Sequence, residues 1–207
     1  PGDLSASAAK KLFSLAPHVG CAIAGLTSDA RVLTKSMQKQ AQGELLNLER
    51  RVPVARLVKD VAADRAQQST QYYGGRPFGV GLLIVGVDET GPHLVEFSPS
   101  GTCAEYTAWA IGARAQSART YFEGRYDSLP QDSLANPFAE CTAERLIQHA
   151  LIALRDCMPP EQLLTAANTS VGVVSVDSDF RIITEDEVGK ALATLPPAVQ
   201  RTVARQE

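Results

Sequence analysis

The sequence predicts an α+β fold in which layers of helices pack on antiparallel sheet. Two observations support this fold class. Short apolar runs of strand character return on themselves after tight turns, as antiparallel hairpins do. Segments with apolar residues at helical spacing occur in pairs between these hairpins, whereas a doubly wound parallel sheet places single helices between its strands. The 207 residues are enough for one compact domain.

The first half of the chain predicts a strand, two helices and a hairpin. The apolar run 19–24 ends at Gly25 and predicts a buried strand. Thr, Ser and Asp at 27–29 are N-cap residue types, and an apolar stripe at spacings of three and four continues to Leu45 and Leu48. The next predicted elements are a second helix that opens at Pro53 and a hairpin made of residues 79–87 and 93–97.

The second half predicts a short strand, two helices, another hairpin and a last helix. The expected elements are a strand through Tyr106 and Ala108, helices 112–126 and 141–158, strands 170–176 and 180–183, and a helix after Thr184. In the helix 141–158 we expect Leu146 and Leu154 to face inward. Thr184 and Glu187 have the spacing of a capping box.

Composition and charge exclude several classes of protein. No apolar run is long enough to cross a membrane. A formal net charge of −3 gives no sign of nucleic-acid binding. The four cysteines form no C-x-x-C pair and the three histidines are scattered, so we expect free thiols in a reducing compartment and no metal site.

Local sequence patterns also argue against a nucleotide-binding enzyme or a hydrolase. The glycines of residues 79–86 lie inside a predicted strand, whereas a phosphate-binding loop needs them between a strand and a helix. The sequence contains no G-x-S-x-G elbow, and none of its histidines stands in a local triad signature.

Two short segments remain as candidates for binding. Lys11 belongs to a basic pair. From composition alone, this pair is interpreted as part of a solvated turn. A loop rich in aromatic residues and glycine follows later, and this composition is more typical of an interaction surface. We assign this loop as a candidate subunit interface formed by Tyr72, Tyr73, Arg76 and Phe78.

Several longer segments together resemble the proteasome α-subunit family. They are GLTSDARVL (25–33), QYYGGRPFGVGLLIVGVDETGPHL (71–94), SPSGT (98–102) and AIGARAQSARTYFE (110–123), in the family's order and spacing from about Lys11 to Leu195. The combination of the second and fourth segments is most similar to the type-1 members of the family. The resemblance implies the Ntn-hydrolase fold, a four-layer αββα sandwich of two antiparallel sheets flanked by helices. It implies one α-type domain over residues 1–207, with a core at about 11–195 and a flexible tail at 196–207.

The resemblance also implies a non-catalytic role. In this family seven α-subunits form each outer ring of the core particle, and the β-subunits of the adjacent ring carry the threonine nucleophile. We therefore expect a structural subunit that supports ring assembly, the substrate gate and docking of the regulatory particle or other activators. It would serve ATP- and ubiquitin-dependent protein degradation in the cytoplasm and nucleus, without a cofactor. The alternative is an active threonine peptidase of the Ntn type, which needs Thr, Ser or Cys as its first residue, and Pro1 has neither a hydroxyl nor a thiol.

The resemblance is weak at the beginning of the chain. Family members begin with a gating tail, a helix on the ring surface and a first strand pair, and residues 1–9 match these poorly. We therefore expect an N-terminally incomplete domain whose first sheet lacks strands and exposes an edge. Lys11 falls at the position of the family's pocket lysine, which meets the C-terminal carboxylate of an activator tail. Gly25 and Leu26 fall at positions that line the same pocket.

Overall fold

The computed structural model describes residues 11–61, 76–128, 136–159 and 161–196. Apart from the first strand, its elements follow one another in the order that the hairpin and helix patterns predict. They are β1 (Leu12–Ala16), β2 (Val19–Gly25), α1 (Thr27–Leu48), α2 (Val54–Val61), β3 (Val80–Asp88), β4 (Gly91–Phe97), β5 (Cys103–Glu105), α4 (Ala115–Asp127), α5 (Ala143–Cys157), β6 (Gly172–Ser175), β7 (Ser178–Ile182) and α6 (Glu185–Ala193).

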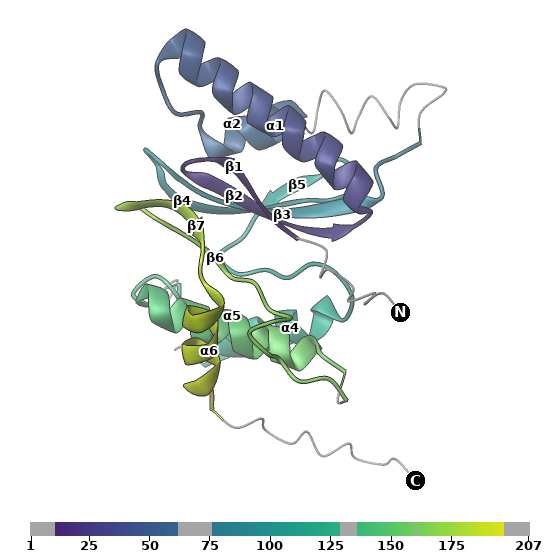
Figure 1. The fold of residues 1–207 in the computed structure, drawn as a ribbon, viewed down its shortest axis with the longest axis vertical. Coiled ribbons are helices and arrows are strands. Elements are labelled where there is room, and N and C mark those ends of the chain that lie inside the picture. Colours follow the sequence, from purple (N-terminus) through teal and green to yellow (C-terminus); the bar gives the residue numbers. More distant parts are fainter. Residues whose placement is uncertain (1–10, 62–75, 129–135, 160, 197–207) are drawn as a thin grey trace, which may run out of the picture.

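The described elements form four layers (Figure 1). Helices α1 and α2 cover the outer face of an antiparallel sheet with the strand order β1-β2-β3-β4-β5. The hairpin β6–β7 lies against the other face of that sheet, and α4, α5 and α6 form the opposite outer layer. The α+β fold class and the αββα order of layers are thereby confirmed. The prediction of one domain over the whole chain stays a prediction, and its tail lies outside the described residues from 197 on.

The main core lies between α1, α2 and the five-stranded sheet. Strand β2 presents Val19, Cys21 and Ile23 to this core, because every second residue of a strand points to the same face. Helix α1 contributes residues at spacings of three and four, including Leu33 and Met37, which have no exposed surface.

The two sheets approach each other closely around Phe180. A Cβ atom added at Gly20 or Gly172 would collide with the Phe180 ring, so glycine is required where this side chain crosses from β7. The backbone N–H of Phe180 also donates to the carbonyl of Pro17 in the β1–β2 turn, at 2.6 Å. These contacts hold the hairpin β6–β7 under the first two strands.

The structure corrects the expectation for the first sheet. Strand β1 precedes the first strand that the sequence predicted, and it pairs with β2 in the register Phe13 to Cys21. The five-stranded sheet therefore begins with a strand pair, and β1 forms one of its edges. Within the described part of the chain, the second sheet consists of β6 and β7 alone.

The helix boundaries and faces also differ from the predictions in places. The N-cap of α1 is Leu26, which makes no side-chain cap bond, so residues 27–29 do not cap this helix. The short strand ends at Glu105 and not beyond Tyr106. Four leucines expected to face inward are exposed by 41–51%: Leu45, Leu48, Leu146 and Leu154. The capping box at Thr184 and Glu187 is confirmed.

No helix within the described ranges is long and apolar enough to cross a lipid bilayer.

Candidate functional site

The turn from β2 into α1 is held by a close approach of two backbone segments. Gly25 has a φ of +127°, a conformation that residues with a side chain rarely adopt. A Cβ atom at this position would collide with the carbonyl oxygen of Gly79, at the entry to β3. The N–H of Leu26 donates to the same Gly79 carbonyl at 2.9 Å. Gly25 is therefore required by both its backbone angle and its neighbour.

A buried carboxylate fixes the other side of this turn. Asp29, in the first turn of α1, is 6% exposed and accepts two hydrogen bonds from the guanidinium of Arg76, both at 2.7 Å. It also accepts the N–H of Gly79 at 2.9 Å. The hydrogen bonds from Arg76, followed by the one from Gly79, lower the pKa of the Asp29 carboxyl to about 2. Asp29 is therefore ionised at every physiological pH.

We call the group formed by Gly25, Leu26, Asp29, Arg76 and Gly79 the turn cluster. Gly79 joins its two halves, because its carbonyl binds Leu26 and its N–H binds Asp29. The cluster connects the end of β2, the start of α1 and the entry to β3. Its backbone is thus fixed from three directions, which is the rigidity that a preformed binding site needs.

Lys11 lies at the same end of the sheet as the turn cluster. Its carbonyl accepts the N–H of Ile23 at 3.0 Å, so it continues the β1–β2 ladder by one residue and lies opposite a position two residues before Gly25. Strand alternation places Lys11 on the face that carries Phe13, which is the face covered by α1. The residue is exposed. The structure therefore brings the three predicted pocket residues to one end of the sheet, and their binding role stays a prediction.

The predicted interface loop is described only at its end. Tyr72 and Tyr73 lie outside the described residues. The guanidinium of Arg76 is bound to Asp29, and Phe78 packs against the main core. Both described residues thus hold the chain together at this point, while an interface role for the loop stays a prediction.

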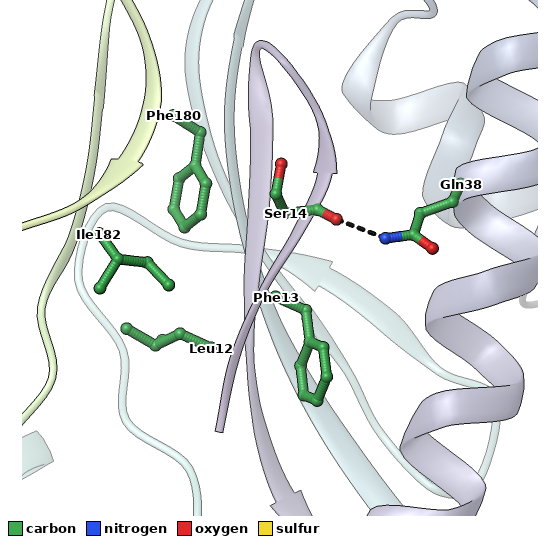
Figure 2. Close-up of a pocket in the computed structure, with 6 residues that line it drawn as sticks. All are labelled: Leu12, Phe13, Ser14, Gln38, Phe180 and Ile182. Atoms are coloured by element: carbon green, nitrogen blue, oxygen red, sulfur yellow. Dashed lines mark hydrogen bonds between the residues drawn. The ribbon is translucent and has the colours of Figure 1, made fainter. Parts of the chain in front are cut away.

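An open hollow of about 480 Å³ lies next to Lys11, between β1 and β7 (Figure 2). Figure 2 shows Leu12, Phe180 and Ile182 converging in the space between the two strands. Ser14 and Gln38 close it on the helix side, where the Gln38 amide donates to the Ser14 carbonyl at 2.7 Å. The residues that line it include no charged side chain, so the hollow can accept apolar groups but offers no acid or base, and none of these residues could activate the Ser14 hydroxyl.

A second cluster of titratable groups lies at the opposite end of the hairpin β3–β4. His93 contacts the carboxylate of Asp88 through Nε2 at 3.0 Å and that of Glu105 through Nδ1 at 2.5 Å. Both ring nitrogens can donate only when the imidazole is protonated. Partial burial alone would lower the pKa of His93, but the hydrogen bonds to Glu105 and Asp88 outweigh burial and raise it. Asp88 also accepts the first N–H of α2, from Val54 at 3.0 Å, so this cluster ties the hairpin to that helix.

Neither cluster is arranged as a metal centre. Among the residues that the structure describes, no three His, Cys, Asp or Glu side chains are arranged to hold a metal ion. The described part of the chain contains a rigid turn cluster at one end of the sheet and an ion cluster around His93.

Sequence reasoning missed Asp29 and Arg76 as partners. The signal was present, since Asp29 lies three residues after Leu26 and Arg76 lies three residues before the predicted strand at 79–87. Their 47-residue separation hides the pairing, because local patterns carry no information on which distant ends meet.

Comparisons with known proteins agree along most of the chain. A family model described as "Proteasome subunit" matches residues 3–174. The "Probable proteasome subunit alpha type-6" of Schizosaccharomyces pombe is 43% identical over 186 residues, which cover 90% of this chain and 65% of that protein. The "Proteasome subunit alpha type-1" of Caenorhabditis elegans is 41% identical over 186 residues, covering 90% and 67%. The "Proteasome subunit alpha type-6" of Saccharomyces cerevisiae is 39% identical over 188 residues, covering 91% and 76%. The chain thus spans about two thirds of the length of the first two of these relatives.

Proposed function

This chain belongs to the proteasome subunit family, with α-type relatives, and we propose that it acts as a non-catalytic structural subunit of the outer α-ring of the core particle. The observation that carries this proposal is the similarity to α-type subunits over nine tenths of the chain. Its partners would be the other α-subunits of a seven-membered ring, the β-subunits of the adjacent ring, and the regulatory particle or other activators. The protein would work in ubiquitin-dependent degradation in the cytoplasm and nucleus.

The competing proposal is an active threonine peptidase. The α-type names of the relatives favour the structural role. The chemistry around the turn cluster agrees with it, since Asp29 and Arg76 neutralise each other and leave neither a general base nor an oxyanion donor.

Purification of the tagged full-length chain from cells tests both proposals. We expect the chain to sediment with other proteasome subunits, and we expect the peptidase activity of the particle to be unchanged when any single threonine of this chain is replaced by alanine. A chain found only as a free monomer would refute the structural role. Loss of one peptidase activity upon replacement of a threonine would support the enzyme instead.

We further propose that Lys11, Gly25 and Leu26 take part in binding the C-terminal tail of an activator. An exposed ammonium at the end of a flexible stem can meet a terminal carboxylate, and the fixed backbone of the turn cluster gives the tail a rigid surface to lie on. Leu26 is 51% exposed and offers apolar contact next to that charge. The support is geometric, since these residues share one end of the sheet.

A free C-terminal activator peptide, titrated into the particle, tests this docking role. Charge-assisted hydrogen bonds contribute roughly 1.5–3 kcal/mol, so Lys11→Ala should weaken binding at this pocket by about tenfold to a hundredfold. Lys11→Arg should restore part of the affinity, and Lys190→Ala on α6 is the matched control that should change nothing. A free peptide is needed because multivalent docking of a whole activator would hide the loss. Unchanged affinity in Lys11→Ala, with the pocket occupied, refutes the role of Lys11.

A further inference from the structure

Helices α4 and α5 pack side by side in the outer layer (Figure 1). Near the start of α4, the backbone of Ala118 contacts the thiol of Cys157, which is the last residue of α5. Further along α4, the hydroxyl of Tyr121 contacts Nδ1 of His149, in the middle of α5, at 2.8 Å. The two helices therefore run in opposite directions, and the last turn of α4 lies beside the first turn of α5.

Each helix contributes one arginine to this junction. Arg125 follows Tyr121 by four residues, and its guanidinium donates to the Tyr121 hydroxyl at 3.3 Å. Arg145 precedes His149 by four residues, so these two side chains are neighbours on one face of α5. Both arginines are exposed. We call the group formed by Tyr121, Arg125, Arg145 and His149 the arginine junction.

The hydrogen bonds within the arginine junction leave only donors for a ligand. The guanidinium of Arg125 can only donate, so the Tyr121 oxygen accepts from it and the Tyr121 hydroxyl donates to Nδ1 of His149. Burial, followed by the charges of Arg125 and Arg145, lowers the pKa of His149, so the imidazole is neutral at pH 7. Its proton is then on Nε2, which has no partner among the described residues.

The two guanidinium charges are not compensated within the described part of the chain. None of its nine ion pairs includes Arg125 or Arg145, and Glu144, the acidic residue of the first turn of α5, is in none of them either. Arg145 lies in that same turn, where the helix dipole disfavours a cation. Arg119, by contrast, packs over the Trp109 ring at 3.9 Å and has a structural role.

We propose that the arginine junction binds a phosphoryl group, carried by a phosphorylated protein segment or by a free phosphate. A phosphate dianion supplies charge for both guanidinium groups, whereas a carboxylate supplies a single charge. The planar fork of each guanidinium fits two phosphate oxygens, and Nε2 of His149 adds a neutral donor. The dipole of α5, which disfavours Arg145 alone, favours the bound anion.

Isothermal titration calorimetry of the purified full chain tests the inference. The probes are inorganic phosphate, the peptide Gly-Gly-phosphoserine-Gly-Gly and its unphosphorylated counterpart. We expect saturable binding of a phosphoryl probe to the wild type, and Arg125→Gln with Arg145→Gln should weaken it by about a hundredfold, roughly tenfold for each lost charge-assisted contact. The matched control, Arg31→Gln with Lys190→Gln, removes the same charge at exposed positions of α1 and α6 and should bind as the wild type does.

A single variant distinguishes lost binding from lost folding. The side chain of Arg145 makes no hydrogen bond or ion pair with another described residue, so Arg145→Gln should fold normally. Its unfolding midpoint in urea should equal or exceed that of the wild type, because a cation leaves the first turn of a helix. Binding of the phosphoryl probe should nevertheless fall about tenfold. Arg145→Lys keeps the charge without the fork and should restore the affinity only in part.

The probes also separate the two sources of the phosphoryl group. Tighter binding of the phosphopeptide than of inorganic phosphate, with no binding of the unphosphorylated peptide, supports a phosphorylated protein segment. Binding of inorganic phosphate as tightly as the phosphopeptide, or more tightly, supports a free phosphate. If neither phosphoryl probe binds, or if the arginine double variant binds as well as the matched control, the inference is wrong.

Discussion

A side chain at Gly25 would destabilise the fold in two ways, through its backbone conformation and through a steric collision. Alanine substitutions at three glycines of this chain distinguish these two effects. Gly25 combines a φ of +127° with a carbonyl too close for a Cβ atom. Gly91, in the β3–β4 turn, has a φ of +121° but no atom within 4 Å of its Cβ position. Gly43, within α1, has neither a positive φ nor a neighbour within that distance. Gly25→Ala therefore measures the backbone strain and the steric collision together. Gly91→Ala measures the backbone strain alone, and Gly43→Ala measures neither.

The expected changes in the free energy of unfolding follow from these geometries. Gly43→Ala should stabilise the protein by roughly 0.5–1 kcal/mol, because alanine is the better helix former. Gly91→Ala should destabilise it by about 1–3 kcal/mol, the cost of holding a residue with a side chain in a sparsely populated backbone region. Gly25→Ala should cost more than Gly91→Ala, since the Gly79 carbonyl and the strand behind it must also move.

Urea denaturation of the purified chain provides the measurement. The single tryptophan, Trp109, is a suitable fluorescence probe because it stacks on Tyr106 with ring centroids 4.0 Å apart. The slope of each transition must stay the same for the midpoints to report stability. Equal losses in Gly25→Ala and Gly91→Ala would falsify the claim that the turn cluster is rigid. A bulky residue at Gly25 would disturb the fold as well as the proposed binding of a tail. Leu26→Ala is therefore the better variant for testing the pocket.

Further predictions concern the His93 cluster, the thiols and the core. Because Glu105 and Asp88 raise the pKa of His93 in the folded state, its contribution to stability is complete below about pH 6.5, the unfolded pKa, and is lost as the pH rises through the folded value. Unfolding midpoints measured from pH 6 upward should fall accordingly in the wild type, and His93→Gln should flatten this dependence. Burial raises the pKa of the Cys21 thiol to about 12, so a thiol reagent should leave it unmodified in the native chain and find all four thiols free after denaturation. Leu33→Ala, at a position with no exposed surface, should lower the free energy of unfolding by about 2–5 kcal/mol.

Sequence periodicity predicted those elements that have one buried face and one exposed face. Helix α1 is an example. The capping box of α6 was predicted as well, because its signal is also local and unambiguous. Strand β1 was missed for the opposite reason. Leu12 points into the hollow between the sheets while Phe13 packs on the core under α1, so both faces of the strand are apolar and no alternation is visible.

The exposed leucines show a different limit of the same method. Spacing tells which residues share one face of a helix, but not whether another element covers that face. Leu45 and Leu48 follow the stripe of α1, yet they lie at its last turns and remain half exposed. In α5, Leu151 is buried whereas Leu146 and Leu154 are not, because the neighbouring layer covers only one part of the apolar side.

The candidate docking site could be predicted only in part, and its two cations show why. In the sequence Lys11 belongs to a basic pair and Arg76 to an aromatic loop, and no local pattern tells which of the two is paired with an acidic residue. In the structure Asp29 is almost fully buried and cannot be hydrated, so it needs Arg76, whose charge is thereby neutralised within the chain. Lys11 is exposed and has no acidic partner within the described residues. Of these two cations, Lys11 is therefore the one that an incoming carboxylate could meet, and only the three-dimensional pairing distinguishes it from Arg76.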